Sequence, residues 1–215
     1  MKKFEKFLQS LPAETFPANT HIYTRWKKVE KRYIVVEGIV AIVSYDKLGV
    51  EKRIMGVMKG EVIPSGSMTE IPRFADYEYV AYTDCVLAEF TDKNLQQLIS
   101  DPELVMEKMK IQDLRTRQAN LRIETLMQGK AEDKLMYLFL YMAERIGQAT
   151  PAKEVVLVDT KMSQTDIGNS LGLTRETTAK VVNKLTKAKM IMPAGKGHYM
   201  VHKRLLVKAV CDRDC

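Results

Sequence analysis

Apolar residues follow two different periods along the chain, and the change falls near residue 92. Between residues 33 and 90, short runs of β-branched and aromatic residues alternate with turns, as in 33–45, where Glu37-Gly38 separates two apolar runs. Short strands at this spacing predict a small barrel or sandwich. Residues 4–11 place Phe and Leu at helical spacing and predict a helix before the first strand.

After residue 92 the pattern is helical. A short helix is predicted over 94–100, and Asp101-Pro102 starts the next one, because proline is well tolerated at the first helical position. That helix continues without Gly or Pro as far as Gln128, and another apolar helix follows Gly129. The predicted organisation is therefore a β domain at 1–100, a long helix at 101–129 and a C-terminal domain at 130–215.

The long helix carries a partial heptad seam. With Leu104 at position a, the a and d positions include Leu104, Ile111, Leu114, Gln118 and Leu121. Polar interruptions of this kind fix the register of a coiled coil. Other apolar residues fall on the remaining faces, which suits a helix that lies between its own β domain and a partner subunit. The seam predicts a homodimer, and the alternative is a long core helix inside a monomer.

Residues 163–185 have the spacing of a helix-turn-helix unit. Ser163 is placed to cap a helix, with Asp166 three residues later as in a capping box. Gly172 can end that helix in a left-handed conformation, and Thr174 can cap the next one. Gly168 lies inside the first helix, where glycine costs about 1 kcal/mol relative to alanine. A glycine there indicates that a second helix crosses closely.

The second helix of this unit would expose Arg175, Glu176 and Lys180 in its first half, with Lys184 one turn further. Early residues of such a helix meet base edges, where Arg and Lys donate to guanine and Glu accepts from cytosine. An intrahelical pairing of Glu176 with Lys180 is also compatible with the spacing. The predicted DNA-binding residues are Ser163, Gln164, Thr174, Arg175, Glu176, Thr177, Lys180, Lys184 and Lys196.

A two-stranded wing follows the second helix. Residues 190–192 and 198–202 have strand character, and the turn at 194–197 contains two glycines around Lys196. Lys196 would approach a phosphate, a contact that positions the protein without reading sequence.

The composition agrees with a nucleic-acid partner. The formal net charge is +7, and residues 160–210 contain ten basic residues against Asp166 and Glu176. A localised excess of this kind indicates a polyanion partner, although a solvated basic face is the alternative.

No apolar run is long enough to span a bilayer, so a cytoplasmic protein without membrane contact is expected. Cys85, Cys211 and Cys215 fit no CxxC pair, so reduced thiols are expected rather than a disulfide framework or a zinc finger.

The order of these elements, together with Ser163 to Lys180 and above all Thr174-Arg175-Glu176-Thr177, resembles the CRP/FNR family of bacterial transcription regulators. Residues 36–40 and 59–63 are similar to the turns of that family's β-roll. The resemblance implies an α+β protein with an N-terminal β-roll of the cyclic-nucleotide-binding type, a long dimerisation helix and a C-terminal winged helix-turn-helix domain. It also implies a homodimer on a palindromic double-stranded operator, and RNA polymerase as a partner if the protein is an activator.

The effector positions depart from the family pattern. Cyclic-nucleotide binders of the family carry Gly-Glu for the ribose, Arg-Ser or Arg-Thr for the phosphate and hydroxyl residues on the long helix. The matching positions in this sequence are Pro64, Ser65, Ala75, Asp76, Ala119 and Asn120. Because Asp76 would repel a phosphate, cyclic-nucleotide binding is not expected in this alignment. An alignment with one gap recruits Arg73 instead and remains open. The family's iron-sulfur cysteines are absent, no haem site is evident, and no cofactor or metal is predicted.

A catalytic barrel of cupin type is the main competing class. It requires a metal or an acid/base cluster, and residues 30–90 contain no His/Glu ligand spacing, so an enzyme is not expected. A cyclic-nucleotide module that acts on a protein partner is disfavoured by the winged helix. The predicted function is a dimeric, sequence-specific DNA-binding transcription regulator with an unidentified effector or none. Activation and repression are both compatible with the sequence.

Overall fold

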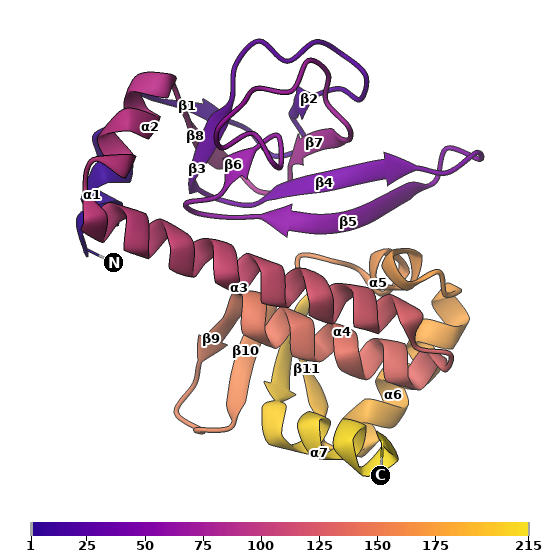
Figure 1. Ribbon diagram of the computed structural model, residues 1–215. Coiled ribbons are helices and arrows are strands. Elements are labelled where there is room, and N and C mark those ends of the chain that lie inside the picture. The colour runs from indigo at the N-terminus through magenta and orange to yellow at the C-terminus, as the bar shows by residue number, and fades with distance from the viewer. Residues whose placement is uncertain (1, 215) are drawn as a thin grey trace. The chain divides into compact units, whose positions relative to one another are not determined.

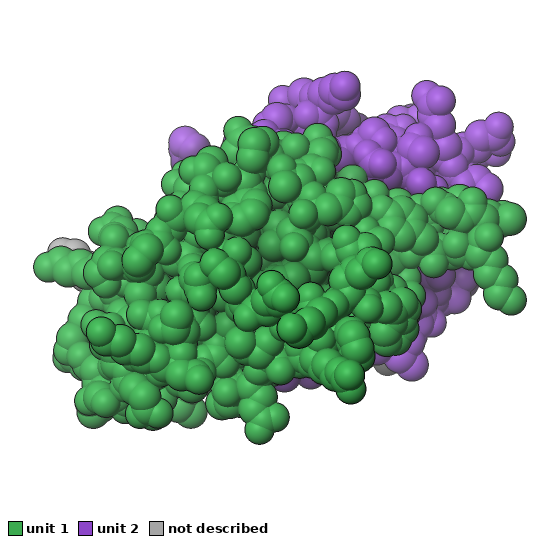
Figure 2. Space-filling view, turned by 90° about the horizontal axis from the view of Figure 1, so that it is seen from above, with its two compact units in different colours: residues 1–115 green, residues 116–215 purple. Residues whose placement is uncertain are grey.

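The structure, a computed structural model, describes residues 2–214, with side chains from residue 3 to residue 211. The chain divides into two compact units, Met1–Arg115 and Thr116–Cys215, which Figure 2 shows in separate colours. The predicted α+β class is confirmed, with an N-terminal β domain, a long helix and a C-terminal helix-turn-helix domain. The division between the two units falls inside the long helix.

Unit 1 is built from strands with helices at both ends of its sequence. Its elements are α1 (Lys2–Gln9), β1 (Ala13–Phe16), β2 (His21–Tyr23), β3 (Tyr33–Glu37), β4 (Val40–Tyr45), β5 (Glu51–Val57), β6 (Val62–Ile63), β7 (Glu78–Ala81), β8 (Cys85–Glu89), α2 (Asp92–Ile99) and the first half of α3 (Pro102–Met127). Residues 13–89 form two four-stranded antiparallel sheets, in the orders β1-β8-β3-β6 and β2-β7-β4-β5. Figure 1 shows β4 and β5 as a long hairpin.

Two cores stabilise unit 1. Inward-facing residues of both sheets, among them Val35, Ile42, Tyr79 and Leu87, are buried together, as alternation along the strands requires. A second core joins α1, α2 and the start of α3 to the strands, with Phe4 and Leu104 among its members. Burial of these apolar side chains is the main favourable contribution to folding.

Unit 2 is organised around one strongly apolar helix. Its elements after α3 are α4 (Ala131–Ile146), β9 (Gly147–Ala149), β10 (Val155–Asp159), α5 (Gln164–Leu171), α6 (Arg175–Lys187), β11 (Ile191–Gly195), β12 (His198–His202) and α7 (Lys203–Asp214). Residues 135–143 of α4 are all buried, against α5, α6, β10, β12 and α7. The strands pair antiparallel in the order β11-β12-β10-β9. Residues 131–134 and 144–146, at the two ends of α4, are not buried.

Most predicted elements are found near their expected positions, including α1, α3 and the hairpin of the wing. Two elements differ. One is β9, which the sequence pattern does not predict, because its three residues are exposed and carry no apolar alternation; they pair with β10. No helix was predicted after the wing, where the structure has α7.

Cys85 is buried and Cys211 is exposed, and both thiols are free. Cys215 lies outside the described residues. Among residues 2–214, no helix combines the length and the apolarity that crossing a bilayer requires.

Candidate nucleic-acid interface and effector pocket

Local hydrogen bonds define both helices of the helix-turn-helix unit. The Ser163 side chain accepts from the backbone N–H of Asp166, whose carboxylate accepts from the backbone N–H of Ser163, so the capping box is complete. α5 ends at Leu171, and the C-cap residue Gly172 has a φ of 68°, in the left-handed region. Thr174 then caps α6 by accepting from the backbone N–H of Thr177. These groups satisfy backbone donors that a helix start leaves free.

Gly168 allows the two helices to approach closely. A Cβ at this position would lie 2.7 Å from Thr178 Oγ1 on α6 and 2.9 Å from the backbone oxygen of Leu173. Real Cβ atoms do not approach other atoms so closely, so the glycine is required by the crossing. Thr178 is fully buried at the contact and donates its hydroxyl to the backbone oxygen of Thr174.

α6 buries one side and exposes the opposite one. Thr178, Val182 and Leu185 are buried on the inner side. The helical period places Glu176, Lys180, Asn183 and Lys187 on the outer side, and all four are exposed. Sequence reasoning missed Asn183 and Lys187, although they lie seven and eleven residues after Glu176, a spacing that places them on the same side of a helix. Among the described residues, Glu176 and Lys180 form no ion pair with each other.

The wing is attached to the start of α5. The backbone N–H and the hydroxyl of Thr160 both donate to the backbone oxygen of Gly197, at 2.8 and 2.9 Å. Gly197 has a φ of 76°, and a Cβ there would lie 3.3 Å from the backbone of Lys161. This contact places the exposed Lys196 beside the first turn of α5.

A groove of about 330 Å³ joins these parts, and ten residues line it: Met162, Ser163, Gln164, Thr165, Arg175, Pro193, Gly195, Lys196, Gly197 and Tyr199. It therefore brings together four of the predicted DNA-binding residues, Ser163, Gln164, Arg175 and Lys196. Burial raises the pKa of Tyr199 in its wall, and a hydrogen bond with Gln164 opposes the shift. Two cations and a helix N-terminus make this groove favourable for a phosphate.

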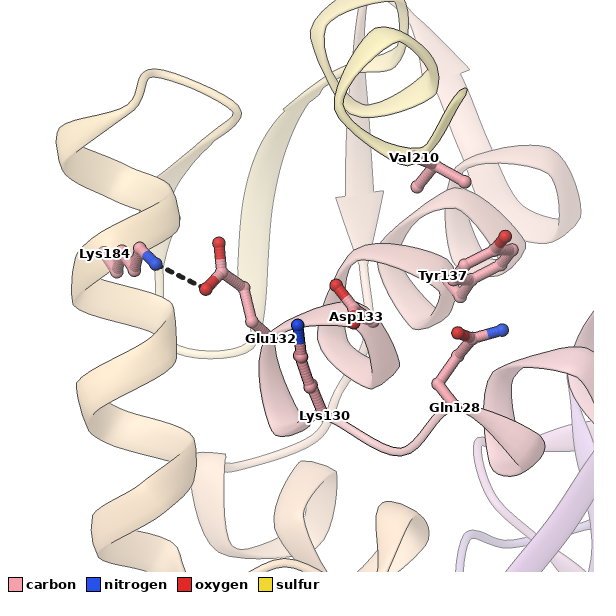
Figure 3. A pocket seen from close by; sticks show the side chains of 7 residues that line it. All are labelled: Gln128, Lys130, Glu132, Asp133, Tyr137, Lys184 and Val210. Atoms are coloured by element: carbon pink, nitrogen blue, oxygen red, sulfur yellow. Dashed lines mark hydrogen bonds and ion pairs between the residues drawn. The ribbon is translucent and has the colours of Figure 1, made fainter. Parts of the chain in front are cut away.

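Lys184 is directed elsewhere. Its ammonium group lies 2.5 Å from a carboxylate oxygen of Glu132, in the first turn of α4 (Figure 3). The pair lies at a second pocket, of about 560 Å³, lined by Gln128, Lys130, Glu132, Asp133, Tyr137, Lys184 and Val210. Lys184 is therefore engaged within unit 2, whereas Arg175, Lys180, Lys187 and Lys196 form no ion pair with any described residue.

The C-terminal half of α3 also contacts the helix-turn-helix. Arg122 is buried and donates to the backbone oxygen of Ser170 on α5 at 2.7 Å. Burial lowers the pKa of Arg122, and the neighbouring Tyr141 opposes that shift. Gln118, also buried, accepts from Arg145 of α4.

Unit 1 contains a pocket of about 300 Å³ between the segment after β5 and α3, lined by Glu61, Val62, Ser65, Gly66, Met68, Lys108, Met109, Gln112 and Arg115. Arg115 extends into it and donates to Glu61 at 2.7 Å and to the Ser65 hydroxyl at 2.8 Å. Lys108 donates to the backbone oxygen of Gly60 at 2.7 Å. Burial lowers the pKa of Lys108 to about 8, although the charge of Glu61 opposes the shift.

The predicted effector residues do not converge on this pocket. Of that set only Ser65 lines it. Ala75 is buried in a backbone pairing with Lys27, and Asp76 is exposed. Arg73 is also exposed, with its guanidinium 5.1 Å from the ring of Phe74. Of the other predicted effector residues, Pro64 is buried in unit 1, and Ala119 and Asn120 lie in the part of α3 that belongs to unit 2.

The predicted dimer seam is largely engaged within the chain. Leu104 is buried in the core of unit 1, and Ile111 packs against the same core. Gln118 is buried, and Leu121 packs against the core of unit 2. Of the predicted seam only Leu114 is well exposed, at 45%.

Comparison with known proteins agrees with this geometry in both units. Residues 13–101 match the model of the cyclic nucleotide-binding domain, and residues 133–205 match that of the Crp-like helix-turn-helix domain. The chain belongs to the CRP/FNR family of transcription regulators. Members of this family are DNA-binding transcription regulators, which confirms that part of the predicted function, and they are not enzymes, as the sequence predicts.

Individual relatives of this CRP/FNR chain are distant. The global nitrogen regulator of Nostoc sp. is 26% identical over 182 residues, which is 83% of this chain and 80% of the relative. The cAMP-activated global transcriptional regulator CRP of Salmonella typhimurium is 23% identical over 193 residues, 89% of this chain and 90% of the relative. The structure of FixK2 from Bradyrhizobium japonicum has a TM-score of 0.70 at 19% identity and covers 92% of this chain and 96% of its own.

Proposed function

We propose that this regulator binds a palindromic operator as a homodimer, in the cytoplasm, and reads bases with α6. The observation that carries the proposal is the outer side of α6, where exposed polar and cationic side chains continue into the groove beside the wing. Arg175, Glu176 and Lys180 are assigned to base edges, because early residues of a recognition helix enter the major groove. Asn183 and Lys187 extend the same side toward the DNA backbone.

The other predicted DNA-binding residues fall into three groups, according to the interactions that their side chains make in the structure. Ser163 and Thr174 cap helices, and Thr177 bonds to Thr174, so they act mainly by orienting backbone N–H groups toward phosphate. Gln164 and Lys196 line the groove and are assigned to the DNA backbone. Lys184 is paired with Glu132, and its contribution to DNA binding is proposed to be small.

Selection from a randomised duplex library tests the assignment of readers. Arg175→Ala and Glu176→Ala should relax the preference at one base pair in each half-site, because a bidentate base contact is worth about 1–3 kcal/mol. Lys196→Ala should keep the consensus and reduce the salt slope of binding by about one. Lys47→Ala, at an exposed turn of unit 1, is the control. If Arg175→Ala keeps the wild-type consensus, α6 is not the reader.

The dimer contact is proposed for the exposed side of α3. A seven-residue repeat places Met106, Asp113, Asn120 and Met127 at a and Met109, Thr116 and Ile123 at d, and all seven are exposed. This seam is shifted by two positions from the one predicted by sequence. Asn120 at an a position would favour a two-stranded register at some cost in stability.

Analytical ultracentrifugation tests the dimer. Ile123→Glu places a charge in the proposed seam and should shift the wild-type dimer to monomer at micromolar concentration. Leu48→Glu is the matched control, because Leu48 is 89% exposed on the turn between β4 and β5 and should leave the dimer intact. A wild-type monomer, or a dimer unaffected by Ile123→Glu, would contradict this interface.

We propose that unit 1 does not bind a cyclic nucleotide. Some relatives are named as cAMP-activated, but in this chain Pro64, Ser65, Ala75 and Asp76 stand at the positions that would hold ribose and phosphate. Arg115 is instead directed into the unit 1 pocket, where it pairs with Glu61. The alternative with Arg73 has no support from its placement, since Arg73 does not line that pocket.

A further inference from the structure

β11 alone is a weak support for the turn at the tip of the wing. Four of its five residues are exposed, and its register with β12 shifts between Pro193 and Gly195. Pro193 also lacks the backbone N–H that a strand residue donates to its neighbour. Gly195 and Gly197, on either side of Lys196, have φ values of 131° and 76°, and glycine loses more backbone entropy on ordering than any other residue. A fixed Lys196 therefore depends on contacts from another element of unit 2.

The end of β10 supplies those contacts. Thr160 donates twice to the backbone oxygen of Gly197, as described above, and Asp159 lies directly opposite His198 in the antiparallel pairing of β10 with β12. Nδ1 of the His198 ring lies 3.0 Å from the backbone oxygen of Lys196, and Nε2 lies 3.4 Å from Oδ2 of Asp159. The imidazole therefore bridges the backbone of the turn and the end of β10.

Both neighbours of the imidazole accept hydrogen bonds. Burial raises the pKa of Asp159, but hydrogen bonds from Lys161 and the charge of His198 outweigh this effect and bring the pKa below its ordinary value. The Lys161 ammonium lies 2.7 Å from the carboxylate, and the backbone N–H of Lys161 donates to it at 3.2 Å. A neutral imidazole has one N–H, whereas the imidazolium has two. Only the protonated ring donates both to Asp159 and to the backbone of Lys196.

We propose that His198, held by Asp159, is a positioning residue that fixes Lys196 for its contact with the DNA backbone. The proposal rests on the function proposed above, which assigns Lys196 to a phosphate. Lys196 is exposed and lines the groove that also contains Arg175, so a fixed backbone keeps its ammonium group at this groove. DNA then binds without having to order the turn, which lowers the entropic cost of binding. Asp159 would itself repel a phosphate, so it acts through His198 and not by touching DNA.

Two variants separate positioning from charge when the operator affinity of the full chain is measured by fluorescence anisotropy. If charge alone mattered, Asp159→Asn would raise the affinity, because it removes a negative group near the phosphates. Under the proposal it lowers the affinity. His198→Ala should lower it by about fivefold, the factor that corresponds to one hydrogen bond of about 1 kcal/mol. His21→Ala is the matched control, because His21 pairs with Glu78 in unit 1 in the same manner, and it should leave the affinity unchanged.

The conservative variant and the pH profile give a second readout. His198→Asn should restore most of the affinity, since its amide can still donate to the Lys196 oxygen. Wild-type affinity should fall as the pH rises through the range in which an imidazole titrates, about pH 5.5 to 7.5, because the neutral ring loses one hydrogen bond. The charged groups that face the ring are Asp159 and Lys161 on the β10 side and Lys196 on the turn. His198→Asn should lose this slope.

The Lys196→Ala background shows whether the pair acts through Lys196. There, His198→Ala and Asp159→Asn should have no further effect, because residues that act through one group are not additive. A full effect of His198→Ala in this background, a rise in affinity in Asp159→Asn, or a pH slope unchanged in His198→Asn would overturn the proposal. If Lys196→Ala weakens binding and His198→Ala does not, only the positioning role is wrong. If Lys196→Ala binds like the wild type, the phosphate contact assigned to Lys196 is wrong, and the positioning role falls with it.

Discussion

The proposed DNA-binding face of unit 2 and the pocket of unit 1 differ in how their cations are engaged. On α6 and the wing, the lysine and arginine cations other than Lys184 are exposed and form no ion pair with a described residue, so they remain available to a polyanion. In unit 1, Lys108 is buried and donates to Gly60, and the half-buried Arg115 donates to Glu61 and Ser65. The cations of α6 and the wing are therefore free to bind an anionic partner, whereas those of the unit 1 pocket already bind groups of the same unit.

The difference follows from the cost of keeping a cation without a charged partner at each of the two sites. A cation on a helix surface costs little in the absence of DNA, because water solvates it. A cation in a pocket requires a partner at all times, since an unpaired buried charge is strongly destabilising. An anionic effector that binds in this pocket would therefore compete with Glu61 for Arg115, whereas DNA at the proposed face of unit 2 would compete only with solvent.

The largest expected effect comes from removing the close crossing in unit 2. Gly168→Val should lower the free energy of unfolding of unit 2 by about 3 kcal/mol, the upper end for overpacking, because one of the atoms in contact is a backbone oxygen. Operator binding should be lost with it. Denaturant unfolding and a binding titration measure both effects. Gly129→Val, where no atom lies within 4 Å of the new Cβ, is the control and should bind normally.

A smaller effect is expected from the buried charge of unit 1. Lys108 has a pKa of about 8 in the fold and regains the ordinary 10.5 on unfolding, so the unfolded chain holds more protons between these values. The stability of unit 1 should therefore rise with pH, by about 2 kcal/mol between pH 8 and 9.5 at 1.36 kcal/mol per unit.

Hydrogen exchange of unit 1 measures this slope. Lys108→Met should abolish it, because the methionine does not titrate. Lys110→Met, on an exposed position of the same helix, should preserve it. An unchanged slope in Lys108→Met would show that another group titrates.

A third comparison distinguishes two lysines of the same helix. Lys180→Ala should weaken operator binding by at least about 1 kcal/mol, as expected for a base contact. Lys184→Ala should weaken it by less than about 0.5 kcal/mol, the usual range for a surface substitution, because Lys184 is paired with Glu132. Fluorescence anisotropy at two salt concentrations measures the operator affinity of each variant. Equal losses would place Lys184 on the DNA.

The last prediction is that cyclic AMP has no measurable effect. Titration calorimetry with cyclic AMP should give no heat of binding up to the millimolar range, because no described arrangement of unit 1 reproduces the ribose and phosphate contacts. Micromolar binding that is lost in Arg73→Ala would support the shifted alignment instead. Micromolar binding lost in Arg115→Ala would identify the pocket described here as the site.

The sequence was sufficient for the DNA-binding unit because its signals are local. The caps at Ser163 and Thr174, the glycines 168 and 172 and the spacing along α6 all act within a few residues. The pocket of unit 1 depends on residues far apart in sequence, such as Glu61 with Arg115, and no local period predicts that pair. The proposed dimer seam lies between these cases. Its heptad period is visible in the sequence, but the phase proposed for it depends on which residues of α3 the core of each unit buries.

The position of the division between the units, inside α3, has a consequence for protein engineering. Each residue of an α-helix advances the side chains by about 100°. A single inserted residue between Arg115 and Thr116 would therefore separate Met106 and Met109 from Ile123 and Met127 by that angle and break the proposed seam. A chimera that exchanges sensor units at this point should tolerate insertions of seven residues and fail with one or two.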